Sequence, residues 1–385
     1  MLFAKLNDLS IGGKGSYGIA ASAVERKAEL PTYLRITDIF DDGTLNPNEL
    51  KSVDAPNSDK YILKPNDIVF ARTGGSTGRN YFYDGSDGVF VYAGFLIKFS
   101  IDPEKVNPKY VKYYCRSKQY NDWVQSFNTG STRGNINAQT FGNMEIPLPD
   151  RKQQDYLVSI LEPIDEKIKI NKQINDNLAD LLQTIYQERF VNDILAVNQG
   201  VLSDICSYSR DKVAVSELNV RTYFSTENML SGKAGSTEAT SLPTTSQTTA
   251  CHKGDTLISN IRPYFKKIVY CEDKCGCSTD VLCFTPSQPR YSAYLFSTLY
   301  ADKFFAFMVA GSKGTKMPRG DKQQIMTYPV VLPSEEELAG FNTIASPLLE
   351  QIYSNRAENK RLSILRDTLL PKLMSGEIDV SAVKL

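Results

Sequence analysis

The stretch Val158–Leu182, with the sequence VSILEPIDEKIKINKQINDNLADLL, decides the architecture of this chain because it occurs a second time. It aligns without a gap with Asn342–Arg366, whose sequence is NTIASPLLEQIYSNRAENKRLSILR. The two segments share residues at one constant offset: Ile160/Ile344, Pro163/Pro347, Ile168/Ile352, Asn171/Asn355, Asn175/Asn359, Leu178/Leu362 and Leu181/Leu365. A gapless repeat of this kind indicates that one structural unit is present twice.

Both segments have the period of a helix that pairs with another helix. Apolar residues and asparagines follow one another in steps of three and four, which is the a/d seam of a coiled coil. Asparagines in such a seam cost stability but fix register and orientation when they pair. Because they lie mid-helix in both copies, we expect an antiparallel coiled coil that brings all four together. The residues predicted to pair the helices are Ile164, Ile168, Asn171, Asn175, Leu178, Leu348, Ile352, Asn355, Asn359 and Leu362.

Two features depart from an ideal seam. Arg366 stands where the pattern calls for leucine, and Pro163 and Pro347 lack the amide donor that a helix interior needs. We therefore expect the prolines to start or kink each helix. A helix from residue 163 to 191 would be roughly 40 Å long at about 1.5 Å per residue. The simpler alternative is two amphipathic helices that pack on separate cores.

Fainter likeness precedes each helical copy in the same order. Thr37-Asp38 corresponds to Thr226-Glu227, Asp67-Ile68 to Asp255-Thr256, and the segment 146–149 to 330–333. We therefore predict an α+β fold with two globular α/β heads, each followed by a long helix, related by a pseudo-two-fold axis. The expected divisions are residues 1–150 (first head), 151–198 (central spacer helix), 199–333 (second head) and 334–385 (distal spacer helix and tail).

The heads read mainly as short strands separated by turn residues. In the first head, residues 67–70 and 95–99 are expected strands, and residues 108–127 an expected helix. In the second, residues 255–258 and 281–284 are expected strands, and residues 293–309 an expected helix. The heads differ in sequence more than the helices do, which indicates different binding partners for the heads and one shared kind of partner for the helices.

Composition limits the classes of function. The chain has 385 residues, 41% of them hydrophobic, with 44 basic and 44 acidic residues. The absence of a net positive charge means that any binding to nucleic acid must use local patches or the charge of a partner. No apolar run approaches the roughly 20 residues of a membrane span, so we expect no membrane association and a cytoplasmic protein. Seven irregularly spaced cysteines do not form a disulfide framework.

Motifs for catalysis are absent. The sequence contains neither a phosphate-binding G-x-x-x-x-G-K-[ST] loop nor an Asn/Asp-Pro-Pro-aromatic methylation motif. The segment 13–18 matches G-x-G-x-x-G, but no strand is expected before it, so we interpret it as a turn. His252 is the one histidine, which argues against catalytic triads. Cys271, Cys275, Cys277 and Cys283 lack paired C-x2-C spacing, which favours buried small residues over a zinc site; no metal or cofactor is expected.

Several segments together resemble the specificity subunit of type I restriction-modification systems. The segments that carry the resemblance are Tyr33–Ile39, Ile146–Pro149, Thr184–Asp193, Tyr223–Met229, Ser259–Tyr264 and Leu369–Ile378. The resemblance implies that each head is a target recognition domain for one half of a split DNA sequence, and that the helices are spacers that dock two adenine methyltransferase subunits. It implies further that the chain itself is not catalytic and that restriction or translocase subunits can join the complex.

Two classes of basic, glycine-rich loop, each present twice, are the predicted DNA contacts. Arginine can hold guanine edges or phosphates, and glycine and serine amides can approach a phosphate closely. The first class is residues 71–79 and 259–267, and the second is residues 130–137 and 311–322. The predicted DNA-binding residues are Arg72, Thr73, Gly74, Ser76, Arg79, Ser131, Arg133, Asn135, Asn260, Arg262, Tyr264, Lys313, Lys316 and Arg319.

Unlike heads predict an asymmetric, bipartite target on double-stranded DNA. Helices of the predicted length would span about one turn of duplex, roughly 34 Å. The alternative is a coiled-coil adaptor whose heads bind peptides or glycans, for which 21 tyrosines and 18 phenylalanines would be suited.

Overall fold

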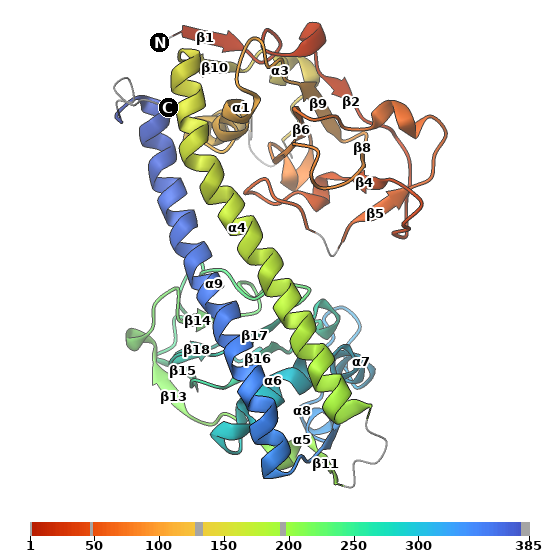
Figure 1. Ribbon diagram of the computed structural model, residues 1–385, viewed down its shortest axis with the longest axis vertical. Helices are drawn as coiled ribbons and strands as arrows, with labels where there is room; N and C mark the ends of the chain where they lie inside the picture. Colours follow the sequence, from red (N-terminus) through yellow and green to blue (C-terminus); the bar gives the residue numbers. More distant parts are fainter. Residues whose placement is uncertain (1, 47–48, 128–133, 193–197, 379–385) are drawn as a thin grey trace. The chain divides into compact units, whose positions relative to one another are not determined.

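The computed structural model describes residues 2–46, 49–127, 134–192 and 198–378. The chain forms two compact units, Met1–Ile168 with Lys360–Leu385, and Lys169–Asn359. Each unit therefore combines one globular segment with parts of both long helices (Figure 1). None of the helices in the described ranges combines the length and apolar character that crossing a membrane requires.

The two long helices are α4, Arg151–Tyr186, and α9, Glu335–Ser375. A capping box starts α9: the amide of Glu337 donates to Ser334 Oγ (3.2 Å), and the amide of Ser334 donates to Glu337 Oε2 (2.7 Å). At α4, Asp150 accepts from the amide of Gln153 (2.9 Å).

The expectation that prolines start the helices is wrong. Pro163 lies inside α4, and Pro347 lies within the range of α9. Leu157 and Leu161, on the turns before Pro163, are buried in the core of the first unit. Their packing supports the helix ahead of the proline and compensates for the one backbone hydrogen bond that proline cannot make.

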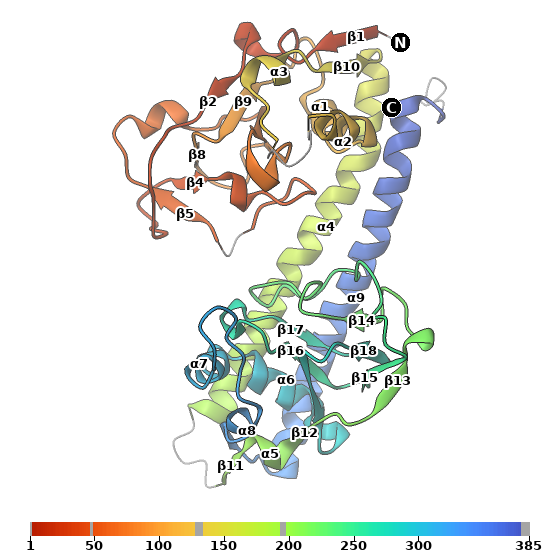
Figure 2. The same ribbon diagram turned by 180° about the vertical axis from the view of Figure 1, so that it is seen from behind.

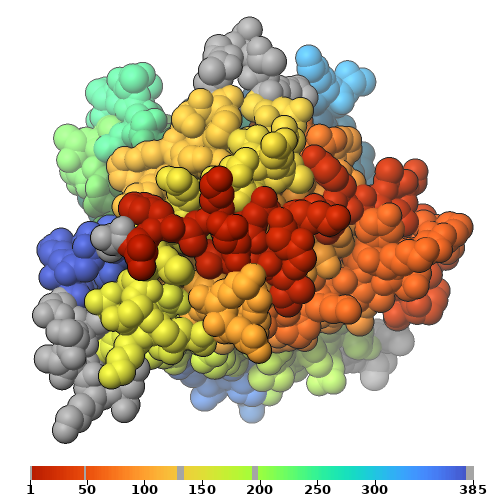
Figure 3. Space-filling view, turned by 90° about the horizontal axis from the view of Figure 1, so that it is seen from above, coloured from red at the N-terminus to blue at the C-terminus, as the bar shows by residue number. Residues whose placement is uncertain are grey.

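Three sheets form the first unit. Strands β1 and β10 pair antiparallel, and β2-β9-β6-β7 form an antiparallel sheet. In the sheet β3-β5-β4-β8, β4 and β8 are parallel. The strands are β1 Leu2–Lys5, β2 Ser16–Tyr17, β3 Ala23–Val24, β4 Thr32–Leu34, β5 Lys51–Val53, β6 Asp67–Ala71, β7 Asn80–Tyr83, β8 Phe90–Tyr92, β9 Leu96–Ser100 and β10 Glu145–Leu148. In Figure 3 the N-terminal residues, in red, lie beside the yellow segment that contains β10 and the beginning of α4.

The second unit repeats this plan. Its sheets are β11-β20, β12-β19-β16-β17 and β13-β15-β18-β14, with β14 and β18 parallel. The strands are β11 Gln199–Val201, β12 Cys206–Tyr208, β13 Lys212–Ala214, β14 Tyr223–Phe224, β15 Gln247–Cys251, β16 Thr256–Ser259, β17 Ile268–Tyr270, β18 Cys275–Cys277, β19 Val281–Pro286 and β20 Pro329–Val331. The repeat predicted from the sequence is therefore also a repeat of strand order in the first two sheets of each unit.

The third sheets of the two units differ in strand order. In the first unit β4 lies between β5 and β8, whereas in the second β18 lies between β15 and β14. Strand β14, which corresponds to β4 in the order along the chain, thus lies at the edge of its sheet, whereas β4 lies inside its sheet. The heads have diverged in backbone arrangement as well as in sequence.

The helices of the heads are shorter than predicted. The single helix expected over residues 108–127 is two helices, α1 Pro108–Tyr114 and α2 Lys118–Gln125, because Ser117 caps α2 by accepting from the amide of Tyr120 (3.3 Å). The helix expected over residues 293–309 is likewise α6 Ser292–Tyr300 and α7 Asp302–Ala310, separated at Ala301, whose backbone is extended. Short helices α3 Ala138–Gly142, α5 Leu202–Ile205 and α8 Lys322–Ile325 complete the heads, and α6 packs on β16 and β19 (Figure 2).

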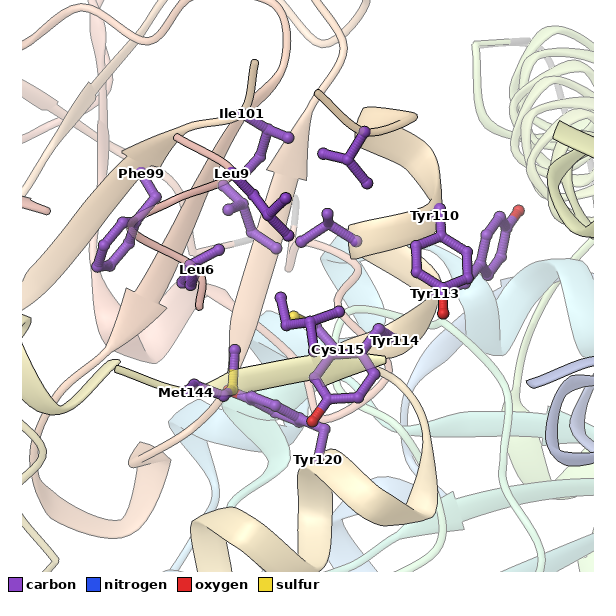
Figure 4. Close-up of a cluster of buried hydrophobic side chains, with 14 of the residues drawn as sticks. Leu6, Leu9, Phe99, Ile101, Tyr110, Tyr113, Tyr114, Cys115, Tyr120 and Met144 are labelled. Atoms are coloured by element: carbon purple, nitrogen blue, oxygen red, sulfur yellow. The ribbon is translucent and has the colours of Figure 1, made fainter. Parts of the chain in front are cut away.

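Each head builds its main core against both long helices. In the first unit the core joins β-strand residues, α1 and α2 to Leu157 and Leu161 of α4 and to Leu370 and Met374 of α9. Figure 4 shows part of this core: Leu6, Leu9, Phe99, Ile101, Tyr110, Tyr113, Tyr114, Cys115, Tyr120 and Met144. In the second unit, Leu182 and Tyr186 of α4 and Phe341 and Ala345 of α9 enter the equivalent core. The alternative that α4 and α9 pack on separate cores is therefore incomplete, because both helices contribute residues to each core.

The predicted antiparallel pairing of the helices is confirmed. In the second unit, Asn171 Nδ2 donates to Asn359 Oδ1 (2.8 Å), and Asn355 Nδ2 donates to Asn175 Oδ1 (2.9 Å), so numbers rise on one helix as they fall on the other (Figures 1 and 2). Of the other residues predicted to pair the helices, two are buried, Ile164 and Ile352. The remaining four are half-buried: Ile168, Leu178, Leu348 and Leu362.

Candidate nucleic-acid interface

In the first unit, the two loops predicted as separate DNA contacts lie against each other. Strand β6 ends at Ala71, and the backbone carbonyl of Arg72 accepts from the amide of Ile136 (2.9 Å). Thr73 and Asn135 form an antiparallel bridge, and Thr77 Oγ1 donates to the carbonyl of Gly134 (2.9 Å). Residues 72–79 and 134–137 therefore make one continuous surface, which we call the first loop pair.

The second unit joins its loops in the same way. Ile261 and Arg319 form an antiparallel bridge, and the amide of Arg262 donates to the carbonyl of Pro318 (2.8 Å). Lys313 and Arg319 exchange two backbone hydrogen bonds of 2.9 Å, which folds the basic loop into a hairpin. Residues 260–267 and 311–322 form the second loop pair. Each loop pair begins where one strand ends, and aligned aspartates stand at the start of these strands. Asp67 is the first residue of β6, and Asp255 directly precedes β16.

Arg72, at the start of the first loop pair, is held by its backbone and by two aromatic rings. Its amide donates to the carbonyl of Phe95 (3.1 Å), and its carbonyl accepts from the amide of Ile136, so backbone hydrogen bonds hold it on both sides. Its guanidinium carbon lies 5.5 Å from the centroid of the Tyr17 ring and 5.6 Å from that of Phe95. Both distances are within cation–π range. The buried Nε atom of Arg72 has no hydrogen-bond partner among the described residues.

The equivalent backbone position in the second loop pair carries a different side chain. The amide of Asn260 donates to the carbonyl of Asp280 (2.8 Å), as that of Arg72 does to Phe95. Asn260 is buried, and its Oδ1 has no partner in the described part of the chain. Asp280 forms an ion pair with Arg319 (3.3 Å). The two units thus present unlike chemistry on the same backbone framework.

Backbone strain marks the second loop pair. Arg262 (φ 51°) and Lys266 (φ 50°) both adopt the left-handed conformation, on either side of the short turn Pro263–Phe265. Non-glycine residues in this region cost about 1–3 kcal/mol each and cluster at functional sites. The side chain of Tyr264, between them, is 49% exposed, so this strained turn presents an aromatic ring to solvent beside Arg262.

Other predicted contacts are engaged with carboxylates. Arg79 Nε donates to Asp41 Oδ1 (2.6 Å), and Lys313 Nζ donates to Asp321 Oδ2 (2.6 Å). The hydrogen bond from Lys313 lowers the pKa of Asp321. Of the remaining residues predicted to bind DNA, Thr73, Gly74 and Ser76 are half-buried, and Asn135 and Lys316 are exposed. Ser131 and Arg133 lie outside the described residues.

Sequence reasoning missed Tyr17 and Phe95. Tyr17 lies within the segment 13–18 that was interpreted as a turn, but Ser16–Tyr17 is strand β2, paired with β9. The turn is confined to Ile11–Gly13. Exposed aromatic residues beside glycines were the available indication, yet no local pattern shows that both rings meet Arg72.

The cysteines of the second unit are buried, as predicted. Cys251, Cys271, Cys275, Cys277 and Cys283 share one small core with Met229 and Val281. Cys271 and Cys275 Sγ atoms are 3.5 Å apart, and all seven cysteines are free thiols. Within the described ranges no group of histidine, cysteine or acidic residues has the geometry of a metal site.

Two α+β heads that share the strand order of two of their three sheets, each with a loop pair, define a protein with a duplicated head. A family described as the type I restriction modification DNA specificity domain matches residues 28–179. The specificity subunit of the type I restriction enzyme HindI from Haemophilus influenzae is 24% identical over 210 residues, which are 52% of this chain and 45% of that protein. The MjaIX specificity subunit of Methanocaldococcus jannaschii is 21% identical over 340 residues, 73% of this chain and 71% of the relative.

By these matches the chain is similar to the specificity subunits of type I restriction enzymes, and residues 28–179 match the family's DNA specificity domain. The fold agrees with a crystal structure of the specificity subunit from M. genitalium, with a TM-score of 0.52 and 18% identity over 97% of this chain and 95% of the other. The alignment with the HindI subunit spans less than half of that protein's length.

Proposed function

We propose that this chain recognises a bipartite, asymmetric DNA target, with one half-site read by each unit. The observation that carries the proposal is the loop pair, which recurs on one backbone framework with unlike side chains at the equivalent positions Arg72 and Asn260. A shared framework suits the same approach to a DNA groove, while different side chains suit different bases. The family relatives are named as specificity subunits, which agrees with this function and not with an adaptor for peptides or glycans.

The chain alone should bind DNA weakly. Its formal net charge is zero. In the loop pairs, Arg79, Lys313 and Arg319 are already paired with Asp41, Asp321 and Asp280. A phosphate has to displace these carboxylates before it can bind the cations, so affinity gained from phosphate contacts is reduced. Partner subunits would therefore complete the positive surface.

Adenine methyltransferase subunits, two per chain, are the partners that we propose for the helices. The repeat retains Leu181/Leu365 and Pro163/Pro347, although all four residues are exposed. Leu181 is 47% exposed and Leu365 46%. Residues that are kept in both copies but not used in the cores suit two identical docking sites for one kind of partner. Catalysis would then belong to these partners and to restriction subunits where present, and this chain would be the non-catalytic component.

The division of labour follows the boundaries 1–150, 151–198, 199–333 and 334–385. In this proposal residues 1–150 and 199–333 read DNA, and the helical segments set the gap between the half-sites. At about 1.5 Å per residue, the 36 residues of α4 extend for about 54 Å, more than one turn of duplex.

The test is to assemble the chain with its methyltransferase partner and to map the adenines that the complex methylates. A split motif with two unrelated halves is expected. Exchanging residues 1–150 for those of a relative should change one half of the motif and leave the other half and the gap intact. A contiguous or palindromic motif, or a change in both halves, would contradict the proposal.

Affinity should be compared with and without the partner across salt concentrations. We expect the assembled complex to bind tightly and to lose affinity steeply as salt rises, whereas the lone chain binds weakly. Tight and selective binding by the lone chain would contradict the role given to the partner's charge.

A further inference from the structure

We infer that Arg72, held between Tyr17 and Phe95, reads one guanine in the half-site of the first unit. The inference rests on the proposed function and adds to it a base, an atom pair and two positioning residues. The contact between Arg72 and Tyr17 does not follow from the family match, because Tyr17 lies outside the matched residues 28–179.

The backbone of Arg72 is fixed from both sides. Its amide donates to Phe95 of the segment before β9, and its carbonyl accepts from Ile136 of the neighbouring loop. The preceding strand β6 is buried along its whole length and lies between β9 and β7. Arg72 therefore begins the loop from a rigid element, which is what a contact that must discriminate one base from another requires.

The aromatic rings fix the side chain in turn. Tyr17 is itself held, because its hydroxyl accepts from the amide of Ala138 at the start of α3 (3.2 Å). A guanidinium that lies over aromatic rings keeps the donors along its edge available for hydrogen bonds. Those edge donors match O6 and N7 of guanine, which accept two hydrogen bonds from one arginine in the major groove.

The rings of Tyr17 and Phe95 are exposed to solvent, which is unfavourable for large aromatic side chains. Tyr17 is 46% exposed and Phe95 55% exposed, and both lie against Arg72 at the loop surface. Among the described residues the buried Nε of Arg72 has no hydrogen-bond partner, so the aromatic rings are the side-chain contacts that these residues give the guanidinium. Such positioning is unnecessary for a phosphate contact, which any flexible cation can make.

A comparison within the chain supports the assignment. Arg79, in the same loop pair, has its guanidinium bound to Asp41 and to the carbonyl of Ile39 (3.2 Å). Arg72 has no such carboxylate among the described residues and is oriented by rings instead. In the second unit the equivalent residue is Asn260, with Asp280 in the place of Phe95. Reading through a clamped arginine is therefore a property of the first unit.

The experiment uses the assembled complex and duplexes that carry its mapped target. Each guanine of the first half-site is replaced, one at a time, by 7-deazaguanine, which lacks N7, or by inosine, which keeps both O6 and N7. For the unaltered complex, one 7-deazaguanine position should weaken binding about 10-fold or more, and inosine at that position should not. The variant Arg72→Ala should bind the guanine and 7-deazaguanine duplexes equally.

The positioning residues Tyr17 and Phe95 are tested by the ratio of the affinities for the guanine and 7-deazaguanine duplexes. Tyr17→Ala and Phe95→Ala should lower the discrimination against 7-deazaguanine several-fold, whereas Tyr17→Phe, which keeps the ring, should retain most of it. Lys60→Ala, an exposed cation of the same unit, is the matched control and should keep the full discrimination. Unchanged base discrimination in the second half-site shows that each variant complex is folded and assembled.

The possible failures are distinguishable. If Arg72→Ala weakens binding to all duplexes alike and the effect of 7-deazaguanine persists, Arg72 holds phosphate and the inference is wrong, although the proposed function stands. The inference also fails if no first-half guanine responds to 7-deazaguanine. If the unaltered complex retains no duplex selectively, the proposed function itself fails.

Discussion

Asp165 of α4 accepts from three cations and a tyrosine within the first unit. Its carboxylate contacts Arg116 (2.7 Å), Lys112 (3.2 Å) and Arg366 (3.1 Å). Arg366 interrupts the apolar seam of α9, and this ion pair explains why an arginine is tolerated there. Burial by itself would raise the pKa of Asp165, but the three cations lower it to about 2.

Replacing Asp165 by asparagine should destabilise the first unit by ~3 kcal/mol at neutral pH. The substitution removes the negative charge and leaves Lys112, Arg116 and Arg366 close together without compensation. Denaturant unfolding of the two proteins measures the difference. Asp367→Asn is the control, because Asp367 contacts the same Arg366 (2.9 Å) but its side chain is 64% exposed, and its loss should cost less than about 1 kcal/mol.

The difference in free energy of unfolding between the natural protein and Asp165→Asn should also depend on pH. A carboxyl whose pKa is depressed in the folded state stabilises that state above its ordinary value, near 3.8, and loses this contribution as pH falls through about 2. The two unfolding curves should therefore approach each other between about pH 4 and pH 2. A difference that stayed constant over this range would show that Asp165 is not held by charge.

At the scale of elements, the long helices combine apolar seams with polar layers that specify how they pair. Asn171 is completely buried, and its Nδ2 also donates to Glu358 (2.7 Å). Asn175 and Asn355 form the neighbouring layer, where Gln351 donates to Asn355 Oδ1 (2.8 Å). These hydrogen bonds are satisfied only in the antiparallel register, which is how a costly polar layer selects one pairing.

Changing one member of the Asn175–Asn355 pair to leucine should destabilise the fold by about 1–3 kcal/mol, since the remaining amide is buried without its partner. Changing both should recover much of that loss or exceed the original stability, because two leucines pack in an apolar seam. A double-mutant cycle measured by thermal unfolding gives the coupling between the residues. Additive effects would mean that the two amides do not interact.

The exposed repeat residues of the helices allow a test of partner number. Leu181→Lys and Leu365→Lys should each abolish binding of one methyltransferase subunit, so that each single variant carries one partner and the double variant none. Mass measurement of the complex distinguishes these states. Ile364→Lys is a matched control, because Ile364 is 48% exposed on α9 and has no counterpart in the repeat. Two bound partners in both single variants would contradict the docking proposal.

In the whole molecule a head and a helix are both present twice, and we propose that the DNA target likewise has two half-sites. The heads share the strand order of two of their three sheets. They differ in the strand order of the third sheet and in the side chains of their loop pairs. The helices, by contrast, retain identical residues at exposed positions. This contrast is the expected outcome when the heads are free to change their targets and the helices serve a constant partner.

Inserting one heptad into both helices should lengthen the preferred gap in the target. Seven residues add about 10 Å of helix, which corresponds to about three base pairs at ~3.4 Å each. Methylation mapping of the altered complex measures the new gap, while insertion of three residues, which breaks the seam, should abolish assembly. A target with an unchanged gap would show that the helices do not act as the ruler.

Local periodicity and the internal repeat were enough to predict the helices and the duplication of the heads. The steps of three and four along α4 and α9 required a paired helix, and the position of the asparagines predicted the antiparallel direction that Asn171 and Asn359 adopt. The repeat also predicted two heads of one topology. These properties are readable because each depends on residues close together along the chain, or on two copies that can be compared directly.

The arrangement of the loops depends on contacts that form only in the folded chain. Tyr17, Phe95 and Ile136 reach Arg72 from three separate segments, and no spacing rule connects them. The seam explained neither Arg366, whose partner Asp165 lies on the other helix, nor the continuation of α4 through Pro163. In each case the deciding energy comes from contacts between segments distant along the chain: an ion pair, stacked rings, or packing against a core that exists only once the unit has folded.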